Sequence, residues 1–100
     1  MTAYRIVQGT LLLGPALTWA VRSGGVVFDE ADTQWRAYLD GANTITSCPP
    51  LQECSLTVDL EGGGQLRGAC CVVELDAEHA QVKSDCLPEQ FLEPACGEAD

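Results

Sequence analysis

The chain has 100 residues, a length that fits one domain or one domain with an ordered tail. It carries 15 acidic and 5 basic residues, and its formal net charge of −10 argues against a protein that binds nucleic acid directly through phosphates. Hydrophobic residues make up 46 %, too many for a disordered chain, but aromatic residues make up only 6 %, so the core must be mainly aliphatic.

The first 28 residues are predicted to form strands. β-prone residues fill 4–13 and 17–28, and Gly14-Pro15 separates the two runs as a turn signal. Ser23-Gly24-Gly25 marks a second turn before a short apolar strand over 26–28. Three strands joined by tight turns would make a meander.

The apolar run over residues 6–20 is too short and too broken for a membrane span, which needs about 20 apolar residues. As a secretion signal it fits weakly because Gln8, Gly14 and Pro15 interrupt it, and whether residues 1–20 serve as a signal stays open. A chain that keeps Met1 and still uses disulfides is typical of a protein released by lysis. This pattern favours a virus or phage particle.

Residues 29–40 are predicted to form one short helix. Asp29 can cap its first turn, and Gly41 suits a left-handed stop after its last turn. The residues that recur at helical spacing, and would form a stripe on one face of the helix, are Ala31, Trp35, Tyr38 and Leu39. We interpret this stripe as core, although Trp35 and Tyr38 could instead form a ligand platform.

The clearest pattern lies in the second half, where residues 54–60 alternate strictly between inward and outward types. A loop with three consecutive glycines follows at 62–64, and residues 65–75 resume the strand pattern, which predicts a β-hairpin. Apolar residues face one another only in one register. That register pairs Leu60 with Gly64, Val58 with Leu66, Leu56 with Gly68 and Cys54 with Cys70.

The chain changes character at residue 48. Residues 1–47 hold three arginines against four acidic residues, net −1, whereas residues 48–100 hold two basic residues against eleven acidic ones, net −9. We interpret 1–47 as a β-meander with the short helix, and 48–100 as an acidic, cysteine-rich hairpin region with a C-terminal tail. The two form subregions of one small protein, and a single domain is the alternative. The expected fold class is α+β, mostly β, with small antiparallel sheets.

All six cysteines lie in the second subregion, and we expect them to form three disulfides that staple it. Their spacings match no zinc motif. Such a density is typical of an oxidising location, here a virion or the extracellular space. Six cysteines allow 15 connectivities, and the ranked choice pairs Cys54 with Cys70, Cys71 with Cys86 and Cys48 with Cys96.

Catalytic groups are scarce, so we expect no enzyme, no cofactor and no metal site. His79 is the single histidine and lies in a polar run, where a surface residue is far more common than a catalytic one. The triple glycine lacks the lysine and the helix start of a phosphate-binding loop. The abundant carboxylates are typical of a solvated face, or of a surface that imitates nucleic acid or docks a basic partner.

One segment resembles a known family. Trp35-Arg36-Ala37-Tyr38-Leu39 followed by Gly41-Ala42-Asn43-Thr44 resembles a stretch of phage tail-fibre assembly proteins, in which an aromatic-x-x-Tyr-Leu sequence precedes Gly-Asn-Thr. Ala42 interrupts the last part of that pattern here, and the likeness covers residues 24–44, about a fifth of the chain. The resemblance implies phage ancestry and carries no functional residue across.

Three functions fit these observations. The first is a non-enzymatic virion component, such as a capsid decoration or tail protein, that binds itself or a particle surface. The second is a secreted cysteine-rich binding module or inhibitor, and the third is an acidic inhibitor of host defence that mimics nucleic acid. For the virion component, we expect protein partners and a homo-oligomer or larger assembly. Self-association is expected along strand edges of the nearly neutral half, at Tyr4, Ile6, Val7, Leu11, Leu12 and Leu13.

Overall fold

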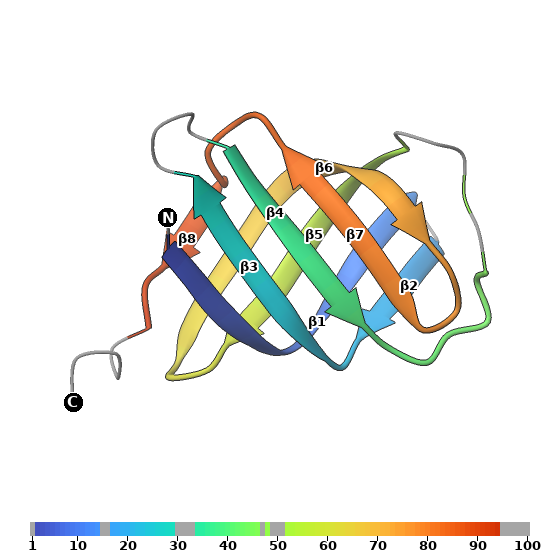
Figure 1. The fold of residues 1–100 in the computed structure, drawn as a ribbon, viewed down its shortest axis with the longest axis horizontal. Helices are drawn as coiled ribbons and strands as arrows, with labels where there is room; N and C mark the ends of the chain where they lie inside the picture. Colours follow the sequence, from blue (N-terminus) through green and yellow to red (C-terminus); the bar gives the residue numbers. More distant parts are fainter. Residues whose placement is uncertain (1, 15–16, 30–33, 47, 49–51, 95–100) are drawn as a thin grey trace.

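The computed structural model describes residues 2–14, 17–29, 34–46, 48 and 52–94. Eight strands make up most of this part of the chain (Figure 1). They are β1 (Thr2–Gly14), β2 (Leu17–Val21), β3 (Ser23–Asp29), β4 (Gln34–Asp40), β5 (Glu53–Leu60), β6 (Gly64–Leu75), β7 (His79–Ser84) and β8 (Gln90–Leu92).

Six of these strands close into a barrel. The sheet runs β1-β3-β4-β7-β6-β5, and β5 then pairs with β1, which joins the two ends of the sheet. Every neighbouring pair is antiparallel. β2 and β3 lie end to end along the same edge of β1, and β8 pairs with the start of β6. Because β1 pairs with β5 and β4 with β7, strands from both halves of the chain build one barrel.

The predicted helix over 29–40 is wrong, and with it the α+β class, because the described residues form an all-β fold. β4 alternates strictly, with Trp35, Ala37 and Leu39 buried and Tyr38 pointing outward. The sequence pattern predicts a helix here because the spacing of Trp35 and Leu39 fits both a helical and a two-residue period. Ala31 and the proposed first turn lie outside the described residues.

The predicted meander also needs correction at its second turn. The backbone continues as a strand through Ser23, Gly24 and Gly25, and β2 and β3 pair with the same edge of β1 on either side of its middle. Gly24 has a φ of 148°, and a Cβ there would lie 2.0 Å from the Tyr38 carbonyl oxygen. Glycine therefore bends this strand against β4 where a turn was expected.

The hairpin of the second half is confirmed residue by residue. β5 and β6 pair in the predicted register from Cys54–Cys70 to Leu60–Gly64. Gly62 and Gly63, with φ of 94° and 95°, make the connecting turn in a backbone region that other residues rarely adopt. The local alternation was sufficient to fix this register because a one-residue slip would turn every buried side chain outward.

The interior of the barrel is filled with side chains. Trp19 and Trp35 are its largest members, and the remainder are aliphatic, as the composition indicates. The Trp19 indole N–H donates to the Asp76 carbonyl at 3.0 Å, which ties β2 to the turn between β6 and β7. The other large side chains that are fully buried in the described residues are Ile6, Leu11, Leu39, Leu56, Leu60, Leu66, Val26, Val58, Val72 and Val82.

Candidate interaction surface

One part of the barrel's outer face carries no charge. In one row across β2, β1 and β5, Ala20 is paired with Thr10 and Thr10 with Thr57; in the next row, Thr18 is paired with Leu12 and Leu12 with Ser55. Ser55 is half-buried and the other five are exposed, while the residues between them along each strand are buried. We call these six residues the uncharged face: Thr10, Leu12, Thr18, Ala20, Ser55 and Thr57.

Charged residues border this face on the β5 and β6 side. Arg67 is paired with Thr57, and Asp59 lies two positions further along β5. Ala69, paired with Ser55, continues the uncharged surface onto β6. On a chain with a net charge of −10, a patch of three strands without a charged side chain is a distinct surface feature.

The structure divides the six residues expected to carry self-association. Leu12 and Val7 are exposed at 41 % and 45 %, respectively, whereas Tyr4 is half-buried. Leu12 belongs to the uncharged face, and Val7 lies at the irregularity in the pairing of β1 with β5. The remaining three, Ile6, Leu11 and Leu13, are buried in the core.

The expected mode of contact changes with this placement. β5 pairs with one edge of β1 over Ile6–Leu12, and β2 and β3 pair with the other edge, so the backbone of β1 is engaged on both sides at Ile6 and over Gly9–Leu12. Edge-to-edge pairing between copies is therefore not available along this middle part of β1. There, contacts between copies would use outward side chains such as Leu12.

A second apolar region lies at the barrel end that β8 covers, the end where the N-terminus lies in Figure 1. The rings of Tyr4, Phe28 and Phe91 contact one another, with centroids 5.1–5.9 Å apart. A surface hollow of about 440 Å³ adjoins these rings, and Leu87 and Pro88 also line it. The three rings pack against each other and line one side of this hollow, which makes the β8 end a second apolar surface.

Among the described residues, the five cysteines predicted to form disulfides are free thiols. Cys54 and Cys70 are paired and buried, with their sulfur atoms 3.4 Å apart and no bond between them. Cys71 is paired with Lys83 on β7, and exposed Cys86 follows the end of that strand. Cys48 packs against the core, and Cys96 lies outside the described residues, so the Cys48–Cys96 pairing stays a prediction.

The contact between the two buried thiols shifts their pKa values in opposite directions. The hydrogen-bonded contact with the Cys70 thiol holds the pKa of Cys54 below its ordinary value, and burial opposes that shift. The same hydrogen bond, together with burial, raises the pKa of Cys70 strongly. Burial also raises the pKa of Cys48. Cys54 is therefore the member of the pair that gives up its proton first.

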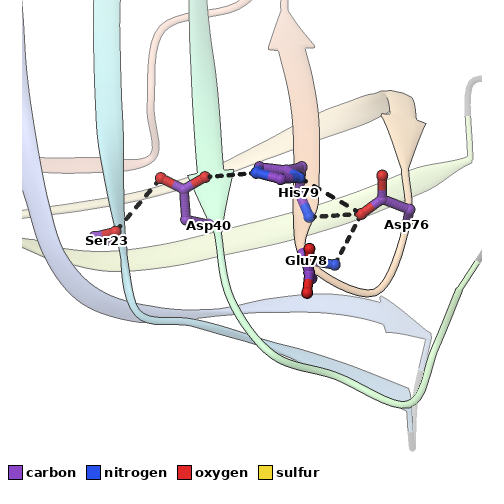
Figure 2. Close-up of polar contacts among 5 residues, drawn as sticks. All are labelled: Ser23, Asp40, Asp76, Glu78 and His79. Carbon is purple, nitrogen blue, oxygen red and sulfur yellow. Dashed lines mark hydrogen bonds and ion pairs between the residues drawn. The ribbon is translucent and has the colours of Figure 1, made fainter.

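His79 is a surface residue at the start of β7, which agrees with its interpretation from sequence. Figure 2 shows it between two carboxylates: its Nε2 is 3.6 Å from Asp40, and its Nδ1 is 3.8 Å from Asp76. The Ser23 hydroxyl donates to Asp40 Oδ2 at 3.4 Å, so the Asp40 carboxylate lies between Ser23 and the imidazole (Figure 2). This order differs from a nucleophile–base–acid triad, in which the histidine bonds the nucleophile.

Asp76 organises the turn between β6 and β7. Its Oδ1 accepts hydrogen bonds from the backbone N–H groups of Glu78 and His79, both at 2.8 Å (Figure 2). These two bonds hold the pKa of Asp76 below its ordinary value. The polar residues drawn in Figure 2 therefore stabilise a turn and a contact between strands.

Comparisons with known proteins give no relatives: no family model, no curated protein and no solved structure matches the chain. In the described part of the chain, no helix is long and apolar enough to cross a membrane. Among the same residues, no three His, Cys, Asp or Glu side chains are grouped to hold a metal ion.

Of the six residues of the uncharged face, only Leu12 was predicted from sequence. The sequence pattern placed Leu12 correctly on a strand, but it could not bring Ser55 and Thr57 beside it, because the β1–β5 pairing joins residues far apart in the chain. The alternation over 54–60 did indicate that Ser55 and Thr57 point outward. Only the closure of the barrel shows which neighbours they meet.

Proposed function

We propose that this protein is a non-enzymatic interaction protein that associates with copies of itself through the uncharged face. The observation that carries the proposal is the pair of rows across β2, β1 and β5 in which no side chain is charged. Leu12 is the largest apolar side chain in this face and would be the central contact.

Electrostatics favours this face over the remainder of the surface. Two copies each carrying −10 repel one another, and the repulsion between acidic groups is largest where those groups are brought closest. Contact through the uncharged face leaves the carboxylates directed away from the interface or at its border. Arg67, paired with Thr57, places a positive charge beside the face and offsets part of the repulsion from Asp59.

The contact would form by packing of side chains from one barrel against another. Thr10, Thr57 and Ser55 present short side chains, which allow two sheets to approach closely around Leu12. The backbones stay within their own barrels. An assembly of this kind orients the acidic surfaces outward, toward solvent or toward a basic partner.

A narrower form of the proposal is a small phage virion component, such as a capsid decoration or tail protein. It rests on the sequence resemblance of residues 24–44 and on the expectation of self-association. The secreted binding module and the acidic nucleic-acid mimic are the alternatives. Neither alternative requires self-association, so an oligomeric state of the purified protein favours the first.

Sedimentation velocity of wild-type protein and a Leu12→Lys variant over a range of concentrations tests the proposal. We expect oligomer in the wild type and monomer in the variant, because a lysine from each copy would be placed at the centre of the contact. Leu87→Lys is the matched control, since Leu87 is 68 % exposed at the β8 end. Glu89→Ala and Glu93→Ala should also leave the oligomer unchanged, because single exposed charges contribute little.

A monomeric wild type would overturn the proposal and favour the two alternatives. An oligomer that resists Leu12→Lys but dissociates on Leu87→Lys would move the interface to the β8 end. Circular dichroism of each folded variant excludes unfolding as the cause.

A further inference from the structure

The sheet is interrupted next to the Cys54–Cys70 pair. β7 pairs with β6 as far as Cys71–Lys83, and β8 begins to pair with it at Arg67–Gln90. Residues 85–89, which connect the two strands, are not in a strand. β6 is therefore uncovered by a strand over residues 68–70 on that side.

A hollow of about 410 Å³ occupies this interruption. Four cysteine residues from three parts of the chain line it: Cys54 on β5, Cys70 and Cys71 on β6, and Cys86 after β7. Lys83, Ser84 and Asp85 line it from the β7 side, and Glu53 lines it from β5. The hollow gives a small molecule a route from solvent toward two thiols that are otherwise buried.

Cys54 and Cys70 have the geometry that bond formation needs. They are directly opposed on neighbouring strands, and their sulfur atoms are already 3.4 Å apart. The Val72 N–H donates to the Gln52 carbonyl two positions away, so Cys54–Cys70 belongs to the hydrogen-bonded class of pairs. The Cα atoms of such pairs stand about 5.5 Å apart, within the span of a disulfide.

We propose that Cys54 and Cys70 form a two-electron redox site that reacts with small-molecule disulfides entering through this hollow. The Cys54 thiolate attacks one sulfur of the reagent, the reagent's S–S bond breaks, and one thiolate leaves and takes up the Cys54 proton. Cys70 then loses its proton and attacks the Cys54 sulfur of the mixed disulfide, which releases the second reagent thiol. In total, two protein thiols are oxidised to one disulfide and one small-molecule disulfide is reduced to two thiols.

The polarisation of the pair supports this order of events. The contact between the two thiols lowers the pKa of Cys54 and raises the pKa of Cys70, which makes Cys54 the attacking and Cys70 the resolving thiol. Cys86 is exposed, and its backbone is held by hydrogen bonds with the Ser84 hydroxyl at 3.2 Å. Cys71 projects beside Lys83, on the opposite side of the strand from Cys70.

The test uses the full-length reduced protein and limiting oxidised glutathione as the probe, followed by acid quench, alkylation of free thiols and tryptic mapping. Cleavage after Arg36, Arg67 and Lys83 separates the cysteines into three fragments, 37–67, 68–83 and 84–100. We expect a link between 37–67 and 68–83, which fragmentation assigns to Cys54 and Cys70. The thiol count should fall from the six of the chain to four.

Single Cys71→Ser and Cys86→Ser variants are matched controls, and each should keep the Cys54–Cys70 link. The wild-type map does not depend on any variant folding. A link between 68–83 and 84–100 with Cys54 still alkylated would overturn the proposal. It would equally be overturned by six unreacted thiols, or by a glutathione adduct that persists on Cys86 with no internal bond.

Discussion

The side-chain carboxamide of Asn43 hydrogen-bonds both backbone polar groups of Ala20. The Ala20 N–H donates to Asn43 Oδ1 at 2.8 Å, and Asn43 Nδ2 donates to the Ala20 carbonyl at 3.0 Å. β2 pairs with β1 along one edge, and Asn43 thereby covers the other edge at its middle. A side chain here takes the place of a neighbouring strand, which protects an edge that would otherwise be open to pairing.

Removing this contact should destabilise the protein. Asn43→Ala leaves the N–H and carbonyl of Ala20 without their side-chain partner, and we expect a loss of about 1–2 kcal/mol in the free energy of unfolding, since a net hydrogen bond contributes about 1 kcal/mol. Urea titration followed by tryptophan fluorescence measures the change. Thr44→Ala, an exposed neighbour, is the control and should alter the midpoint little. Equal effects of the two substitutions would contradict the role given to Asn43.

Gly9 should tolerate no larger side chain. It lies between β2 and β5, paired with Val21 and Val58, and an added Cβ would lie 2.4 Å from Val58 Cγ1 and 2.5 Å from the Thr57 carbonyl oxygen. Gly9→Ala is therefore expected to cost about 1–3 kcal/mol through overpacking.

Gly14 provides the matched control for that substitution. It lies on the same strand, and an added Cβ meets nothing within 4 Å in the described part of the structure. Gly14→Ala should be neutral or slightly stabilising, because alanine reduces the freedom of the unfolded chain. Thermal unfolding of both variants provides the comparison, and an unchanged melting temperature for Gly9→Ala would show that the strands are less tightly packed than described.

The charge on Asp76 should contribute to stability only above acidic pH. Because hydrogen bonds from Glu78 and His79 lower the pKa of Asp76 in the folded state, its contribution is present above the unfolded pKa of about 4. It is lost as the pH falls through the lower folded value.

Asp76→Asn keeps an acceptor oxygen in the turn but removes the charge. We expect this variant to be less stable than wild type at neutral pH and to lose less stability on acidification below about pH 4. Melting temperatures followed by circular dichroism across that range measure the effect. Glu78→Gln removes the same charge from the same turn and is the control. Parallel pH profiles for wild type and Asp76→Asn would contradict the assignment.

The fold was predictable where the pattern was local. The alternation over 54–60, the triple glycine and the demand for apolar neighbours were sufficient to place Cys54 opposite Cys70. The local pattern was not sufficient in β4, where Trp35 and Leu39 are compatible with both a two-residue and a helical period. Only Ala37, which is small and buried, distinguishes the strand there. Acidic residues around position 30 imitate a helix start, and this imitation favoured the wrong period.

The candidate site was predictable only in part, for a different reason. The exposed Leu12 and Val7 were predicted to carry self-association, but so were Tyr4, Ile6, Leu11 and Leu13, because a run of three leucines hides the two-residue period. The pairing of Leu12 with Ser55 spans more than forty residues of sequence. No local pattern reports such a contact, since it follows from closure of the barrel as a whole.

Backbone amide chemical shifts, recorded as labelled wild-type protein is diluted, test the claim of self-association through the uncharged face most directly. The account predicts concentration-dependent shifts at Thr10, Leu12 and Thr57. Amides of Leu87 and Glu89, at the β8 end, should stay unchanged. Shifts confined to the β8 end, or none over the whole dilution series, would contradict it.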